Sequence, residues 1–93
     1  MARFFIDSSD GETPFLDEEG LDLPDAEAAR RAALAGLPDM AADRIPNGDR
    51  REFAVRVRDH DGRSLYYATM VLTGGWCTDG QDPVEHPFSR RRR

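Results

Sequence analysis

The sequence predicts a small α+β domain, in which one main helix packs on one face of a small antiparallel sheet. Three observations support this prediction. Residues 20–42 carry small apolar residues at helical spacing. Residues 52–58 alternate apolar and polar side chains, as a strand buried on one face does. Every other apolar run is short enough to be a strand, so the predicted order is strand, strand, helix, strand, strand.

Two short strands are expected before the helix. Alternation in residues 3–7 assigns Phe4 and Ile6 to one face of the sheet, and Arg3, Phe5 and Asp7 to the other. Turn-forming residues follow, and residues 13–16 predict a second strand. A proline in that second strand restricts it to an edge of the sheet or to a strand start.

The helix has a clear start and one interruption. Asp25 is the expected N-cap, because its carboxylate can accept hydrogen bonds from the free amides of the first turn. The predicted buried stripe consists of Ala26, Ala29, Ala33, Leu37 and Ala41. Pro38 removes a backbone donor within this stripe, which predicts a kink near Pro38 or a break into two helices. A Pro-Asn-Gly loop at residues 46–48 ends the element.

Two further strands form the clearest hairpin in the chain. Residues 52–58 direct Phe53, Val55 and Val57 to the inner face. The turn is expected at Asp-His-Asp-Gly, residues 59–62, and the partner strand at residues 64–73. Its inner face is predicted to carry Tyr66, Ala68, Met70 and Leu72, and its outer face Tyr67, Thr69, Val71 and Thr73.

Length and composition indicate one domain. The 93 residues, 39% apolar and 33% charged, suit a single folded unit at residues 1–77, followed by a flexible Arg-rich C-terminal tail at residues 78–93. No apolar run approaches the roughly 20 residues that a membrane span requires, so no membrane association is expected. The N-terminus lacks the pattern of a secretory signal, and a cytoplasmic location is the default expectation.

Three blocks together resemble a known family. They are RFFIDSSDGE, DEEGLDLPDAEAARRAAL and REFAVRVRDHDGRSLYYATMVL, which span roughly residues 3–73. In this order they are similar to a family of small alphaproteobacterial proteins known only as a domain of unknown function. The resemblance implies the same strand and helix order, and it implies no activity, cofactor or catalytic residue. A fainter likeness is to antitoxins of the HicB type, whose Gly-Asp-Thr helix entry and downstream DNA-binding helix are missing here.

The distribution of charge makes nucleic-acid binding a secondary hypothesis. The chain has 13 basic and 18 acidic residues, and four of the basic ones are Arg90, Arg91, Arg92 and Arg93. The first 89 residues therefore carry a net charge of 9 − 18 = −9. Such an acidic body disfavours duplex binding, because phosphate neutralisation drives that affinity. The four arginines could contact nucleic acid or an acidic surface weakly, or they could form a solvated terminus.

The chain contains no motif that predicts catalysis, a cofactor or a metal. The turn at residues 59–62 lacks the further oxygen ligands of a calcium loop. Cys77 with His60 or His86 falls short of the four ligands of structural zinc, and spacing alone places no base beside the thiol. The acids around the helix entry are expected to form a solvated turn and an N-cap, with a site for a cation or basic partner as the alternative. We therefore expect a protein that is not an enzyme.

The outer face of the sheet carries the most informative pattern. If the strand faces are as assigned, Phe5, Tyr67, Val71 and Trp76 point away from the helix. Aromatic side chains on an uncovered sheet face are typical of an interface. The sequence therefore favours an interaction module that binds a protein partner or forms a homodimer. Two alternatives stay open: the C-terminal segment folds back over this face, or the assigned register is wrong by one residue.

Overall fold

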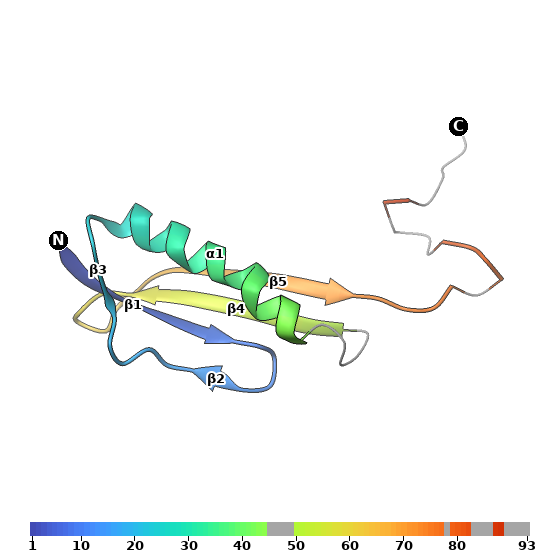
Figure 1. Cartoon of the computed structure of the whole chain (residues 1–93), viewed down its shortest axis with the longest axis horizontal. Helices are drawn as coiled ribbons and strands as arrows, with labels where there is room; N and C mark the ends of the chain where they lie inside the picture. The colour runs from blue at the N-terminus through green and yellow to red at the C-terminus, as the bar shows by residue number, and fades with distance from the viewer. Residues whose placement is uncertain (45–49, 78, 83–86, 89–93) are drawn as a thin grey trace.

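The computed structural model describes residues 1–44, 50–77, 79–82 and 87–88, and it has one helix laid across one face of a sheet (Figure 1). The α+β class is confirmed. The elements in chain order are β1 (Ala2–Ser9), β2 (Pro14–Phe15), β3 (Leu21–Leu23), α1 (Ala26–Arg44), β4 (Arg50–Arg58) and β5 (Ser64–Thr73).

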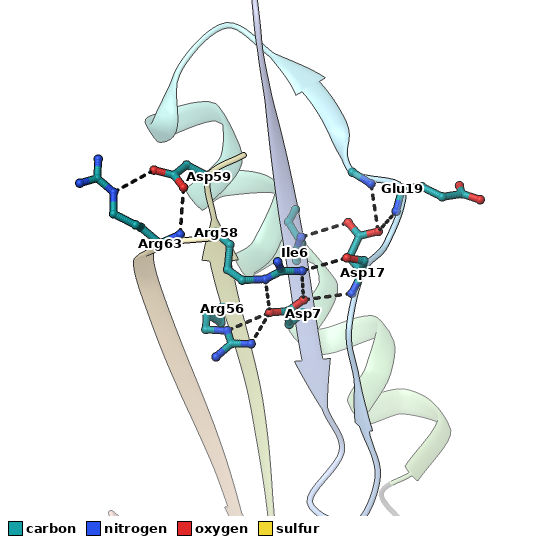
Figure 2. A network of polar contacts seen from close by, with 9 residues as sticks. Ile6, Asp7, Asp17, Glu19, Arg56, Arg58, Asp59 and Arg63 are labelled. Atoms are coloured by element: carbon teal, nitrogen blue, oxygen red, sulfur yellow. Dashed lines mark hydrogen bonds and ion pairs between the residues drawn. The ribbon is translucent and has the colours of Figure 1, made fainter. Parts of the chain in front are cut away.

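All strand pairs are antiparallel, and the sheet order is β2-β1-β4-β5. The predicted order holds with one addition, the short strand β3, which pairs with Ala2–Phe4 at the start of β1. The strands β2 and β3 lie along the same edge of β1, on the side away from β4 (Figure 2). Residues 16–20 interrupt this edge, so the second half of the N-terminal hairpin is a broken strand.

The helix begins as predicted. The Asp25 carboxylate accepts a hydrogen bond from the Ala28 N–H at 2.9 Å, which is the geometry of an N-cap. The helix then runs unbroken through Pro38 to Arg44, so the alternative of two helices is wrong. Leu37 and Ala41, on either side of the proline along the buried stripe, both pack into the core, and this packing holds the helix together where a backbone hydrogen bond is lost.

The core lies between this stripe and the inner face of the sheet. It consists of Phe4, Ala29, Ala33, Leu37, Ala41, Phe53, Val55 and Val57. The predicted faces of β4 and β5 are confirmed by the alternation of buried and exposed side chains along both strands. Ala26 is exposed, so the buried stripe begins one turn later than predicted, at Ala29.

A buried arginine fastens the turn between β1 and β2. Arg51 precedes the predicted strand, yet it lies on the inner face of β4 with only 9% of its surface exposed. Its Nη1 donates to the Asp10 carbonyl at 2.8 Å. The Asp10 carboxylate in turn accepts the Glu12 and Thr13 N–H groups, which closes the turn. These contacts fix one end of β1 against β4.

The chain beyond β5 leaves the sheet. Residues 74–77 continue past the end of the strand and are exposed (Figure 1). The C-terminal residues 78, 83–86 and 89–93 lie outside the described part of the chain, so the boundary between domain and tail stays a prediction. Over the described ranges, no helix has the length and apolar character to span a membrane.

The alanine stripe predicts a sharp size limit at the contact between helix and sheet. Ala33 is 1% exposed, and a larger side chain there would push α1 off the sheet. We expect Ala33→Leu to lower the free energy of unfolding by about 1–3 kcal/mol, the usual cost of overpacking. Urea denaturation followed by circular dichroism measures it. The control is Ala35→Leu on the exposed side of the same helix, which should change the stability little. Equal losses in both variants would contradict the argument.

Candidate interaction surface

The outer face of the sheet, opposite α1, holds two of the four predicted contact residues, both on β5. Tyr67 is 78% exposed and Val71 is 49% exposed. Thr69 lies between them and is also exposed. The outer half of β5 is therefore an open strip with an aromatic and a β-branched side chain. The described residues 74–77 do not cover it (Figure 1).

The other two predicted residues lie elsewhere. Phe5 lies on the outer face of β1 and is half-buried, because the Arg58 guanidinium lies over its ring at 5.1 Å from the centroid. This geometry is a cation–π contact within the chain. Trp76 is 98% exposed and follows the end of β5, beyond two glycines, so it belongs to no face of the sheet.

A buried carboxylate that sequence reasoning did not single out organises the outer face between Phe5 and Tyr67. Asp7 is 5% exposed. Arg58 holds it with two hydrogen bonds, Nε to Oδ2 at 2.8 Å and Nη2 to Oδ1 at 3.0 Å. Arg56 donates to Oδ2 from Nε at 2.8 Å and from Nη2 at 2.6 Å (Figure 2). The Asp17 N–H donates to Oδ1 at 3.0 Å, so three segments meet at one side chain.

A second carboxylate, that of Asp17, accepts a backbone hydrogen bond where the edge strand is interrupted. The Asp17 Oδ2 accepts the Ile6 N–H at 3.1 Å, a donor of β1 that faces the gap between β2 and β3. Its Oδ1 accepts the N–H groups of Glu19 and Gly20, both at 3.1 Å. Gly20 has φ +77°, and a Cβ there would lie 2.9 Å from the Phe4 carbonyl oxygen. Asp17 thus takes the place of a missing strand partner, in a loop that requires glycine.

The hydrogen bonds control the charge state of both carboxyl groups. Burial alone would raise the pKa of Asp7, but the hydrogen bonds from Arg58, Asp17 and Arg56 outweigh it and lower that pKa to about 2. Burial also opposes ionisation of Asp17, and three backbone N–H groups nevertheless lower its pKa below the ordinary value. The contact with Asp7 raises the pKa of Arg58. In the cluster, defined as Asp7, Asp17, Arg56 and Arg58, these shifts favour the charged forms of Asp7, Asp17 and Arg58 near neutral pH.

A shallow depression of about 290 Å³ lies next to this cluster on the outer face. Its lining is mostly apolar, with Leu16 and Pro14 on the side of β2 and Tyr67 with Thr69 on the side of β5. Arg56 borders it with a side chain that is 44% exposed. An aromatic ring, an arginine and a small apolar hollow are the elements of a protein contact.

The remaining sequence candidates have local roles or lie outside the description. The Asp59 carboxylate accepts the N–H groups of Asp61 and Arg63, both at 2.9 Å, which closes the hairpin turn. Among the acids at the helix entry, Asp22 pairs with Arg3 at 3.1 Å. Cys77 is exposed. His86 and the four arginines Arg90, Arg91, Arg92 and Arg93 fall outside the described residues, so nucleic-acid contact through them stays a prediction.

Fold and surface together define a small α+β protein with one sheet face covered by the helix and one that the described residues leave uncovered. The model of one protein family, described as "Domain of unknown function (DUF6894)", matches residues 3–71. The chain belongs to this family, as the three sequence blocks indicated. No curated protein and no solved structure matches the chain.

Removing the Asp7 charge should leave the positive charges of Arg56 and Arg58 close together without a negative partner. We expect Asp7→Asn to lower the free energy of unfolding by about 2–4 kcal/mol, because Arg58, whose side chain is 22% exposed, loses its charged partner, while Arg56 at 44% stays partly solvated. The control is Asp22→Asn, which removes an ion pair whose side chains are 47% and 55% exposed. That loss should stay below about 1 kcal/mol. Chemical denaturation of both variants measures the difference, and losses of similar size would refute the central role of Asp7.

The low pKa of Asp7 makes a specific contribution to stability that depends on pH. Its folded pKa of about 2 lies below the ordinary 3.8, so the ionised carboxylate stabilises the fold above pH 3.8, and this stabilisation disappears as pH falls toward 2. The shift corresponds to about 2 kcal/mol. The stability gap between the wild type and Asp7→Asn should therefore narrow by about that amount from pH 5 to pH 2. Urea titrations at each pH test this, and a constant gap would contradict it.

Proposed function

We propose that this protein is a small non-enzymatic interaction module that binds a protein chain, either its own kind or another, through the outer face of its sheet. The observation that carries the proposal is Tyr67. This residue is 78% exposed on a regular strand, beside a mostly apolar depression of about 290 Å³. An exposed tyrosine on a rigid element offers a large contact area at a low cost in conformational entropy.

The neighbouring arginine supports the same proposal. Arg56 borders the depression and is 44% exposed, yet two hydrogen bonds to Asp7 already hold its guanidinium in place. A side chain that is ordered before binding loses little rotamer freedom when a partner arrives. Tyrosine and arginine are also the residue types enriched at the energetic centres of interfaces. The depression is thus flanked by two suitable anchors.

The two acids of the cluster support a binding role over a catalytic one. A general acid or base needs a carboxyl that can exchange a proton with a substrate near the working pH. The pKa of Asp7 is lowered to about 2, and both of its oxygens accept hydrogen bonds from the chain itself. The Asp17 carboxylate is likewise occupied by three backbone N–H groups. These acids hold the face in shape.

Site-specific photo-crosslinking in the native host tests the proposal. A benzophenone amino acid replaces Tyr67 in one variant and Ala35, on the exposed side of α1, in a matched control. We expect discrete crosslinked species from position 67 and none of the same mass from position 35, because only the outer sheet face binds. Identical patterns from the two positions, or no crosslink from position 67, would show that this face is not a binding surface.

A further inference from the structure

The two edges of the sheet are very different. One edge is β5, whose residues Ser64–Thr73 pair only with β4 among the strands of the described chain. Alternate residues of such a strand direct their N–H and C=O groups away from the sheet, where they are free to pair with another strand. Natural proteins usually protect an edge with charges, proline or bulges. The ten residues of β5 include no charged residue, proline or glycine, and the irregularity near Val57 and Arg58 affects only the start of the strand.

The opposite edge is protected. It consists of β2 with two residues, including Pro14, and β3 with three residues. The loop between them is occupied by the Asp17 carboxylate, which already accepts the Ile6 N–H of β1. This edge cannot receive a long strand. Pairing through β5 would therefore stop after one addition and could not propagate into a fibre.

We propose that the partner at β5 is a second copy of this chain, paired antiparallel about a two-fold axis at Thr69. This inference rests on the proposed function for self-association, but it places the contact at the free edge of β5 and not over the outer-face depression, and it names the partner and the register. The result is one continuous sheet in which β5 meets its own copy, with both α1 helices on the same face. A two-fold contact of this kind uses the same surface on both copies and closes as a dimer.

The register follows from the side-chain faces. Residues that lie opposite each other in antiparallel strands share a face. The two-fold axis must therefore lie between two copies of the same residue, so that outer side chains meet outer ones. An axis at Thr69 places Thr69 opposite its own copy, and Tyr67 opposite Val71 of the second copy. Thr–Thr pairs and pairs of aromatic with β-branched residues are favourable cross-strand neighbours. On the inner face, Ala68 meets Met70 and Tyr66 meets Leu72, so every pair is free of charge.

This register also uses the part of β5 that the described residues of the single chain leave exposed. Tyr67 and Val71 are 78% and 49% exposed in the single chain. In the dimer, Tyr67 of each copy would contact Val71 of the other copy, so this pair would form twice. The acidic character of the protein does not oppose the contact. The 31 charged side chains are absent from the run between Arg63 and Asp79, so no like charges meet along the paired strands.

Disulfide trapping tests both the partner and the register. The exposed Cys77 is first replaced by Ser, and Thr69→Cys is added to this background. At a two-fold axis the two Cβ atoms lie about 4.5–5.5 Å apart, near disulfide reach. The control is Thr73→Cys on the same face, whose two copies would lie about 26 Å apart along the strands. In a glutathione redox buffer, Thr69→Cys should form a covalent dimer and Thr73→Cys should not.

Light scattering at micromolar concentration provides the second measurement. The wild type should have twice the chain mass of 10.5 kDa, and Thr69→Lys, which places two like charges on the axis, should have the mass of one chain with an unchanged circular dichroism spectrum. A wild type of single-chain mass, or equal trapping at positions 69 and 73, overturns the dimer proposal. If crosslinks from position 67 to a different protein accompany that result, the interaction module stands and only the second copy is excluded.

Discussion

The structure depends on one buried carboxylate, Asp7, and on the donors that surround it. Arg56 and Arg58 reach it from β4, and the Asp17 N–H reaches it from the broken edge strand. Burying charge is expensive, and an apolar cluster of the same volume would often be as stable. The charges instead fix the register between β1 and β4. Asp7 lies directly opposite Arg56, and a shift of β1 by one residue would turn the Asp7 side chain to the face that the helix covers.

The same carboxylate connects the centre of the sheet to its edge. The Asp7 carboxylate accepts the N–H of Asp17, and the Asp17 carboxylate accepts the N–H of Ile6. Each acid therefore binds the backbone of the segment that carries the other. Through this exchange a loop with only two short strands on its flanks is held against β1 (Figure 2). The broken edge is therefore held by hydrogen bonds and is also unsuited to further strand pairing.

Local periodicity was sufficient for part of this structure. The N-cap at Asp25 and the inner and outer faces of β4 and β5 depend on residues close in sequence, and they were predicted. The charged cluster joins residues 49 and 51 positions apart, and it needed the knowledge that β1 lies beside β4. An aspartate in an apolar strand together with Arg-x-Arg in another was the available indication. Phe5 was assigned to the correct face, but its arginine cover depends on the same pairing.

The outer face is consequently divided into two halves of opposite chemistry. Over β1 and β4, Arg56 and Arg58 both bind Asp7, and Arg58 also covers the Phe5 ring. Over β5, the strand has no charge and nothing in the described chain covers its aromatic ring. The register that the ion cluster imposes on β1 and β4 also fixes the flat strand beyond them, since β5 pairs along the whole length of β4. A rigid, uncharged strand at the edge of a charged sheet is the part of the molecule where binding costs the least desolvation and the least conformational entropy.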